Sequence, residues 1–427
     1  MKYVLPFIIV VGLFGCSSAT SDDSANAPAW AGQHTHTLTL GQSDNAEVVK
    51  VIGDGQGDNP RAVLVASKAR KLVLVEITAS GLNVIRERTL LETDSSESEL
   101  THIDVSSDGS WAVLTRTIIT MNGDAQSDCG GELLFVSLVD SASFGDILST
   151  VEVGPMPDSV DVSDDDQWVV SANERDGPDA WGKCEVAGEV ASISVVDVSS
   201  GPAAPTERHR IILTDAATGP REPESVHIAD NDRVAVTLQD SHELALFRIS
   251  ELPLAPTMAD LTIVRLPNDA LGAGPWPDGV LHVKTELETV LVVAGEWNDT
   301  LTVLSVEGDV LSSIVVSASD LPPALPRVLD EGSPPFSPDS LATFSRSGRT
   351  YVAVTLRHAG AVAVYDITDP RAPTYSSSIA VGRSEKGTQD EDGSTIRPEG
   401  IAASADGSFL LTANEAESSL SLIQLIE

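Results

Sequence analysis

The sequence predicts an all-β protein, a seven-bladed β-propeller whose four-stranded antiparallel blades form one ring. A phrase of short apolar strands separated by turn residues occurs seven times, with copies about 50–65 residues apart. Each copy holds the strands of one sheet, and only the last copy lacks a fourth strand. Repeats of this length with several strands each are typical of propeller blades, which bury their faces against neighbouring blades.

The clearest copy comes last and runs from Arg397 to Leu425. It contains a proline–acid pair, a short strand, an Ala-Asp-Gly-Ser turn, a second strand, a polar Asn-Glu loop and a third strand. Five copies open on proline followed by an acid, and the two earliest open on an acid alone. In chain order the opening acids are Glu47, Glu99, Asp158, Glu224, Asp278, Asp339 and Glu399.

The segment HTHTLTL, from His34 to Leu40, alternates like a strand and precedes the first full copy. Because the last copy ends after three strands, we expect this segment to complete the last blade and close the ring. The alternative is a disordered leader. Ring closure places residues 33–427 in one domain.

The N-terminus has the features of a signal peptide over residues 1–15, with a basic Lys2 and a short apolar run. Leu13-Phe14-Gly15-Cys16 resembles a bacterial lipobox, which implies that Cys16 is acylated and that residues 16–32 form a flexible tether. Ser17 after the cysteine resembles the outer-membrane sorting signal. The alternative is an ordinary secretory peptide cut near Ala19. We therefore expect an exported lipoprotein of the outer membrane.

The chain is strongly acidic, with 64 Asp and Glu against 26 Lys and Arg and a formal net charge of −38. Such a surface repels phosphates, so a nucleic-acid partner is not expected. The membrane, through the lipid anchor, is the expected partner, and the ring is expected to be a monomer.

Removing Cys16 leaves two cysteines, Cys129 and Cys184. They fall in long segments (117–130 and 175–188) read as loops between second and third strands of consecutive blades. These loops leave the same face of the ring, so we expect a disulfide between them in an oxidising compartment. The alternative is two free thiols.

The start of each first strand and the end of each second strand lie at the same end of an antiparallel blade. This end, called the top face here, gathers the opening acids and the acids that follow second strands. Clustered carboxylates can bind Ca²⁺ or Mg²⁺. The alternative is that the recurring acids only accept backbone N–H bonds and set the blade spacing. The candidate metal ligands are Asp158, Glu174, Glu224, Asp278, Glu399 and Glu415.

Departures from the repeat are more informative for a ligand site, because scaffold residues should recur in every blade. Blade six has Arg357-His358 after its second strand, where other blades have acids or amides. Tryptophans flank the blade-five acids, an arrangement that suits a sugar or another small polar ligand. The alternative is that they pack over loop bases. The candidate ligand-binding residues are Asp278, Glu296, Trp276, Trp297, Trp181, Arg357, His358 and Arg116.

The sequence has no HExxH, GxSxG, P-loop or CxxC motif, so no catalytic residue is assigned. Two phrases resemble those of bacterial choice-of-anchor propeller proteins, Ser171-Ala172-Asn173-Glu174 with residues 188–199, and Thr412-Ala413-Asn414-Glu415 with residues 397–401. They are also similar to YVTN-type and lactonase-like propellers. The resemblance implies an exported seven-bladed propeller and leaves its activity open.

The sequence therefore favours a propeller that binds a ligand or protein partner at the cell envelope through its top face. One alternative is a metal-assisted hydrolase, lactonase-like or a phosphoesterase, that uses the top-face carboxylates. Another is a purely structural scaffold. Fold alone does not decide between these functions.

Overall fold

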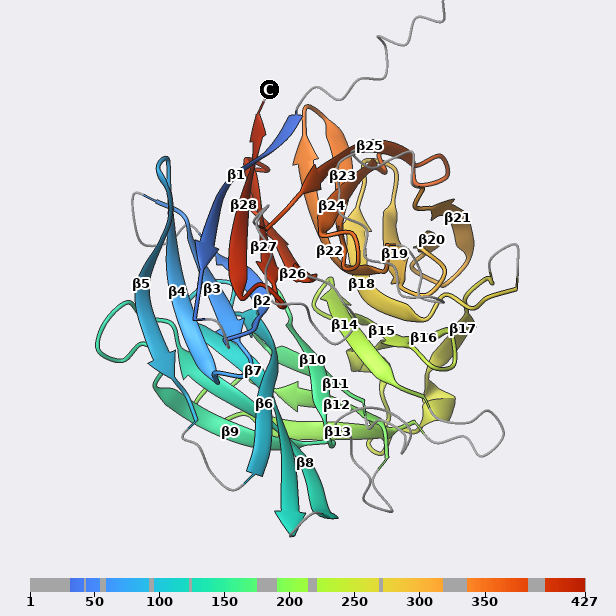
Figure 1. The fold of residues 1–427 in the computed structure, drawn as a ribbon. Helices are drawn as coiled ribbons and strands as arrows, with labels where there is room; N and C mark the ends of the chain where they lie inside the picture. The colour runs from blue at the N-terminus through green and yellow to red at the C-terminus, as the bar shows by residue number, and fades with distance from the viewer. Residues whose placement is uncertain are drawn as a thin grey trace, which may run out of the picture.

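The computed structural model describes residues 31–41, 44–53, 59–91, 96–122, 125–174, 190–213, 221–268, 272–317, 336–382 and 396–426. These residues form seven four-stranded antiparallel sheets arranged in a ring (Figure 1). The predicted fold class is confirmed. Within the described residues, no helix is long and apolar enough to cross a membrane.

The strands follow the predicted order, four to a blade. Blades one to three comprise β2 (Ala46–Ile52), β3 (Arg61–Ala66), β4 (Lys71–Thr78) and β5 (Gly81–Thr89); β6 (Ser96–Val105), β7 (Trp111–Asn122), β8 (Ala125–Ser137) and β9 (Ile147–Val153); and β10 (Pro157–Val162), β11 (Trp168–Asn173), β12 (Ser192–Asp197) and β13 (Thr206–Ile212).

Blades four to seven comprise β14 (Pro223–Ala229), β15 (Arg233–Leu238), β16 (Glu243–Arg248) and β17 (Thr262–Arg265); β18 (Pro277–Lys284), β19 (Thr289–Gly295), β20 (Thr300–Ser305) and β21 (Val310–Val315); β22 (Pro338–Arg346), β23 (Arg349–Leu356), β24 (Ala361–Asp366) and β25 (Thr374–Ala380); and β26 (Pro398–Ala403), β27 (Phe409–Asn414), β28 (Ser419–Ile426) and β1 (Ala31–Thr39). Two 3₁₀ turns, η2 (Ile249–Glu251) and η3 (Met258–Asp260), interrupt the β16–β17 connection.

The N-terminal strand closes the ring as predicted. β1 pairs with β28 from Ala31 opposite Ile426 to Thr39 opposite Ser419, and the two strands lie side by side in Figure 1. Leu38 and Leu40 pack onto the apolar cluster that joins blades seven and one. The strand begins at Ala31, inside the segment expected to be tether; residues 1–30 lie outside the described residues.

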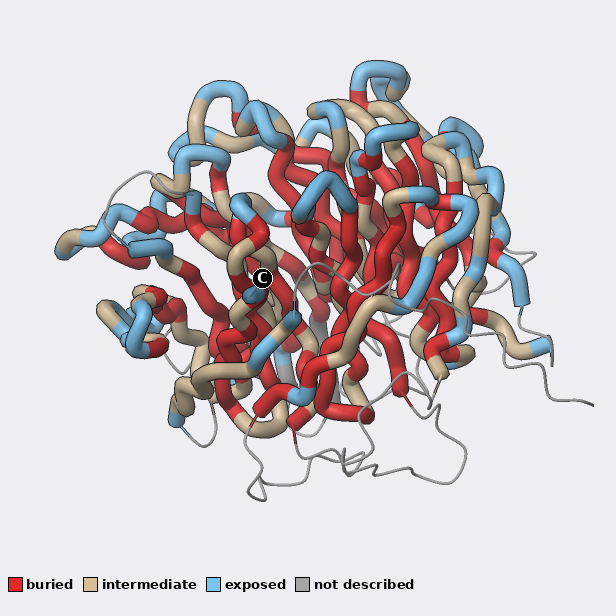
Figure 2. The backbone as a smooth tube through the Cα atoms, turned by 90° about the horizontal axis from the view of Figure 1, so that it is seen from above, coloured by how far each residue is buried: buried red, intermediate tan, exposed pale blue. Residues whose placement is uncertain are grey.

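The core lies between the sheets. The middle strands are buried on both faces, as β3 shows with five consecutive residues, 62–66, at 0% exposure. One cluster joins blades five and six, and similar clusters join other neighbouring blades. Outer strands such as β5 alternate and become exposed. Figure 2 shows this buried interior between exposed turns. Strands buried on both faces need continuous apolar runs, which explains why the second and third strands of the repeat barely alternate.

The segment 117–130 of blade two is a hairpin, not the loop expected from the sequence. β7 and β8 continue past the ends of the other second and third strands and pair up to Asn122 opposite Ala125. Cys129 lies in this extension, 4% exposed and in contact with Met156. Cys129 is disulfide-bonded. Its expected partner Cys184 lies outside the described residues, so the pairing of these two cysteines stays a prediction.

The innermost strands have an edge without a sheet partner, and side chains from the preceding blade bond to it. Asp104 Oδ2 accepts the N–H of Val162 at 2.8 Å, and Asp161 Oδ2 accepts the N–H of Ile228 at 2.6 Å. Lys50 Nζ lies 3.1 Å from Asp104 Oδ1. These contacts satisfy backbone donors that would otherwise stay unpaired, so they hold consecutive blades in register.

Three histidines lie on the same inner strands. His227 and His282 face each other across blades four and five, with Nδ1 atoms 3.1 Å apart. Burial lowers the pKa of His102, His227 and His282 to about 3. All three imidazoles are therefore neutral in the folded protein near neutral pH.

Deleting residues 33–41 should destabilise the ring, because β28 loses its partner strand and the Leu38 and Leu40 contacts are lost. Leu38→Ala should reproduce part of the effect, lowering the free energy of unfolding by about 2 kcal/mol. Thermal and denaturant unfolding check this. A truncation that stops before Ala31 is the control. An unchanged melting temperature after the deletion would contradict the closure.

Stability should depend on pH through the inner histidines. A lowered histidine pKa means that the unfolded chain takes up the proton first, so this contribution is present above pH about 6.5 and is lost as pH falls toward 3. His227→Gln removes the contribution of one imidazole. The stability gap between the parent and this variant should shrink by about 2 kcal/mol between pH 7 and 5, measured by urea unfolding. A gap that stays constant over this range would contradict the neutral, buried state of His227.

Candidate binding site on the top face

A recurring backbone bond builds the top face. The residue before the first strand has a left-handed conformation in five blades, at Asn45, Met156, Trp276, Ser337 and Arg397, with φ between 46° and 52°. The carbonyls of these residues, and of Glu222, accept the N–H of the residue that follows the second strand. The donors are Ser67, Glu174, Gln239, Glu296, Arg357 and Glu415, at 2.7–3.1 Å.

This bond places two side chains of each blade next to each other, one from the start of the first strand and one from the end of the second. A register shift then follows in every first strand, for example between Pro157 and Ser159 and between Pro277 and Val280. A left-handed conformation before proline is unfavourable for most residues, so its recurrence indicates that the surrounding bonds hold it in place.

The structure brings the predicted carboxylates together. We call top-face cluster the side chains at these positions, namely Glu47, Thr101, Asp158, Glu224, Asp278, Asp339 and Glu399 on first strands and Ser67, Glu174, Gln239, Glu296, Arg357 and Glu415 after second strands, together with Arg397. The six candidate metal ligands are all members. Every carboxyl group in the cluster except that of Asp339 belongs to a half-buried residue and keeps some contact with solvent.

The sequence analysis chose Glu99 as the opening acid of blade two, and the structure shows that the equivalent position is two residues later, at Thr101. Asp104 and Asp161 are equivalent, since each accepts an N–H from the first strand of the next blade. Thr101 precedes Asp104 as Asp158 precedes Asp161, so Thr101 occupies the ring position. Glu99 is exposed and lies opposite Thr117 in a longer strand pair. The extended hairpin of blade two shifted the apparent repeat.

Arg357 is the central cation of the cluster. Its Nη1 lies 3.0 Å from Glu296 Oε1, and its Nε lies 2.7 Å from Glu399 Oε1 and 3.9 Å from Asp339 Oδ2. Burial alone would lower the pKa of Arg357, but Glu399, Glu296 and Asp339 outweigh it and raise this pKa well above its ordinary value. One guanidinium thus connects the acids of blades five, six and seven.

Arg397 is the second cation, and the sequence analysis did not assign it to the site. Its Nε lies 2.6 Å from Glu399 Oε1 and 3.1 Å from Glu415 Oε2. Asn45 Nδ2 donates to Glu415 Oε1 at 3.0 Å, which extends the network to blade one. The sequence did contain a signal for Arg397, because a charged residue stands there before the proline–acid pair. Blades three, five and six have the uncharged residues Met156, Trp276 and Ser337 at this position.

The remaining carboxyls repel one another. Burial, and after it the charges of Glu415 and Glu399, raises the pKa of Glu47 well above its ordinary value. Burial and neighbouring carboxylates likewise raise the pKa of Glu224, Asp278 and Asp339. Low access to solvent makes a second negative charge costly, which is why the pKa of each of these carboxyls lies above its ordinary value.

The aromatic shelf of blade five is present. The rings of Trp276 and Trp297 have centroids 5.4 Å apart at 30°, and Trp297 is 44% exposed. The rings of His242 and Trp276 have centroids 6.2 Å apart. Trp276 precedes Asp278 by two residues, and Trp297 follows Glu296 directly. Trp297 offers an exposed face.

The two residues of the Asn-Glu pair, which was expected to be a loop, have different roles. Asn173 and Asn414 end their strands fully buried, and each side-chain amide donates to two serines of the next strand at 2.9–3.1 Å. Only the following Glu174 and Glu415 join the cluster. The phrase that carried the family resemblance thus marks a buried polar network of the sheet.

Two other candidate residues, Arg116 and His358, have contacts of their own. Arg116 forms an ion pair with Glu132, its partner across β7 and β8, at 3.0 Å. His358 interacts electrostatically with Asp299. Asp299 Oδ1 accepts the N–H groups of Phe336 and Ser337. Burial raises the pKa of Asp299 to about 6. Trp181 and Cys16 lie outside the described residues.

The metal prediction has no matching geometry in the described part of the chain, where no group of three or more His, Cys, Asp or Glu side chains is arranged to hold a metal ion. The arginines instead occupy the space between the closest carboxylates. What the arrangement can do is attract positive charge, present an exposed indole beside it, and exchange protons through carboxyls of raised pKa.

No family model matches the chain, and a search of curated proteins finds no match. Solved structures do resemble it. Virginiamycin B lyase from Staphylococcus aureus shares 14% identity with a TM-score of 0.53, over 93% of this chain and 100% of that one. The periplasmic gluconolactonase of Pseudomonas aeruginosa shares 14% identity with a TM-score of 0.56, over 88% and 91%.

A third similar structure is a β-propeller domain of a fungal Swd1 protein from Myceliophthora thermophila, with 10% identity and a TM-score of 0.56 over 92% of this chain and 99% of that one. At these identities the likeness concerns the fold alone, and the two enzymes among these structures have different activities, a lyase and a gluconolactonase. The chain is thus a seven-bladed β-propeller similar in architecture to known lyase and lactonase propellers.

Proposed function

We propose that this propeller is a binding protein of the cell envelope that takes a small polar ligand carrying positive charge at its top face. The observation that carries the proposal is the charge of the top-face cluster, nine carboxyl groups against the two guanidiniums of Arg357 and Arg397. Four of these carboxyls have a pKa well above the ordinary value because they are buried and, after that, because other carboxylates lie near them. A bound cation would relieve this repulsion.

The exposed face of Trp297 supports an organic cation over a simple ion. An indole attracts ammonium groups through its ring face, and this attraction adds to that of nearby carboxylates. Glu296 precedes Trp297 in the chain and is itself held by Ser337 Oγ at 2.9 Å and by Arg357. The carboxylate is therefore fixed beside the ring before any ligand arrives, which lowers the cost of binding.

A second candidate is a hydrolase, and one feature favours it. Asp278 and Asp339 have a raised pKa next to the ion-paired Glu296 and Glu399, so acids and bases lie in one cluster. Pairs of carboxyls with separated pKa values are suited to general acid and base catalysis. Metal assistance by Ca²⁺ or Mg²⁺ belongs to this candidate, and metal analysis of the purified protein decides on it.

The proposed location follows from the lipobox-like Cys16 and from the direction of β1. This strand ends at the top face, because Thr39 lies opposite Ser419 at the start of β28, so the chain enters the ring at Ala31 on the opposite face. A flexible tether between Cys16 and Ala31 has a mean reach of about 20 Å. An anchored ring would therefore carry its top-face cluster on the side away from the membrane.

The double variant Asp278→Asn and Glu296→Gln should lower the affinity for organic cations at least tenfold, because it removes two charges beside the indole shelf. Calorimetric titration with choline and spermidine measures this, and Glu286→Gln, which removes one exposed acid on the opposite face of the same blade, is the control for a general loss of surface charge. Unchanged binding in the double variant would refute the site. Turnover of a lactone or phosphoester that only the double variant loses would favour the hydrolase instead.

Cys16→Ser should move the protein from the membrane fraction to the soluble fraction, because the acyl attachment point is gone. Fractionation of cells that express either form measures this. Equal membrane partitioning of both forms would exclude the lipid anchor while leaving the ligand site standing.

A further inference from the structure

A pocket lies between blades four and five at the face of the ring opposite the top-face cluster, and it shares no residue with that cluster. It has a volume of about 390 Å³, within the usual range for small-molecule sites. Its wall exists because the β16–β17 connection is long and carries η2 and η3, whereas β4 and β5 are joined by a tight turn. The pocket is therefore a departure from the repeat.

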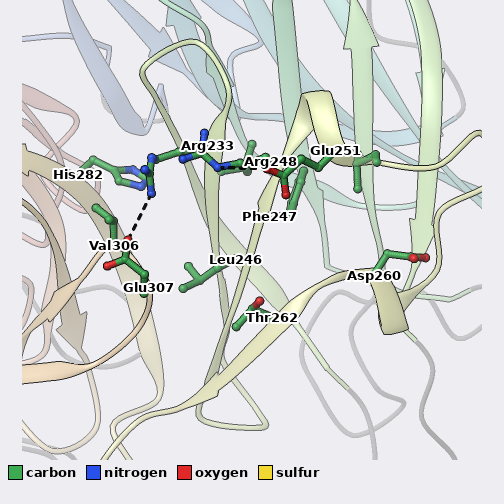
Figure 3. Close-up of a pocket in the computed structure, with 12 residues that line it drawn as sticks. Arg233, Leu246, Phe247, Arg248, Glu251, Asp260, Thr262, His282, Val306 and Glu307 are labelled. Atoms are coloured by element: carbon green, nitrogen blue, oxygen red, sulfur yellow. Dashed lines mark ion pairs between the residues drawn. The ribbon is translucent and has the colours of Figure 1, made fainter.

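The pocket is lined by charged groups of both signs. Arg233 and His282 lie at one end, Glu251 and Asp260 lie toward the other, and Leu246 lies between them (Figure 3). Glu307 lies 3.8 Å from Arg233, and Glu251 lies 3.6 Å from Arg248. Leu246 and the half-buried Val306 supply apolar surface. The lining therefore favours a ligand that carries both charges and has an apolar part.

Arg233 is held loosely. Its Nε lies 3.8 Å from Asp230 Oδ2, and its Nη1 lies 3.8 Å from Glu307 Oε1. Both carboxylate side chains are exposed, at 72% and 70%. Exposed pairs at this distance contribute little stability, so a ligand that replaces them loses little. Arg248, in contrast, lies 3.0 Å from Asp232 and is already bound.

His282 adds a neutral polar wall beside Arg233. Burial lowers its pKa to about 3, and its Nδ1 faces His227. It therefore brings no second positive charge to this end of the pocket. The guanidinium of Arg233, next to the carboxylate of Glu307, matches the head group of an α-amino acid, whose carboxylate and ammonium are adjacent.

The geometry points to a binding site for a free α-amino acid with a large apolar side chain. The carboxylate of the ligand pairs with the Arg233 guanidinium in the two-pronged manner that arginine favours, and its ammonium pairs with Glu307. The apolar side chain of the ligand lies over Leu246 and Val306. This site is separate from the proposed top-face site, so a test of one does not decide the other.

The test is a calorimetric titration of the full mature protein with L-phenylalanine, 3-phenylpropionate and 2-phenylethylamine. L-phenylalanine should bind at least tenfold more tightly than either analogue, because each analogue lacks one charge of the head group. Equal affinity for 3-phenylpropionate would overturn the proposal, and so would the absence of L-phenylalanine binding at millimolar concentration.

Variants locate the site. Arg233→Gln and Glu307→Gln should each weaken L-phenylalanine at least tenfold, and Thr262→Trp should block it by filling the pocket from an exposed position. Arg208→Gln is the matched control, since Arg208 is an exposed arginine of blade three that pairs with Asp197. Choline binding at the top face should stay unchanged in all of them. Equal losses in the Arg233 and Arg208 variants would overturn the site.

Discussion

Each blade has two apolar faces and can bury them only against the blades on either side. The clusters that join consecutive blades follow from this constraint, as do the buried middle strands such as β3 and the closing pair of β1 and β28. A linear stack would leave two terminal faces in water, so the ring is the arrangement that satisfies all seven sheets. The axis then collects seven first strands whose inner edges have no sheet partner, and polar side chains such as Asp104 and Asp161 gather there to bond them.

The top-face cluster is a by-product of the same repeat. In six blades one backbone bond, from the residue after the second strand to the residue before the first, fixes two side chains at one end of the ring. Repetition of an acid at these positions places several carboxylates in a limited space, where their negative charges repel one another. Arg357 and Arg397 relieve part of the repulsion in blades five to seven, while Glu47 and Glu224 lack a comparable cation among the groups that act on them. The charge of the cluster is therefore uneven around the ring, which makes one side more attractive to a cation than the other.

Sequence periodicity was enough to predict the fold, the strand order and ring closure, because these depend on apolar runs and turn residues that recur. It also located most of the top-face carboxylates, because a proline–acid pair marks the start of the first strand. It failed where a local feature replaced the repeat. The hairpin of blade two displaced the acid pattern, so Glu99 was chosen in place of Thr101. Asn173 and Asn414 were read as loop residues because asparagine favours loops, although serines across the sheet satisfy them in full. Arg397 was missed although it stands where other blades have uncharged residues, and the pocket beside Arg233 depends on side-chain packing between blades, which no single-strand pattern contains.

Closure by β1 also sets the order in which the molecule can fold. The hydroxyl of Thr35 donates to the carbonyl of Leu422, a bond between residues 387 positions apart. Contacts this distant in sequence form slowly, since the entropy of a very large loop must be lost first. One face of the first blade would thus stay exposed to water until the last strand of the chain has joined blade seven. During that interval the uncovered apolar faces could bind those of other copies, and the abundant negative charge of the chain would help to keep incomplete rings from associating with one another.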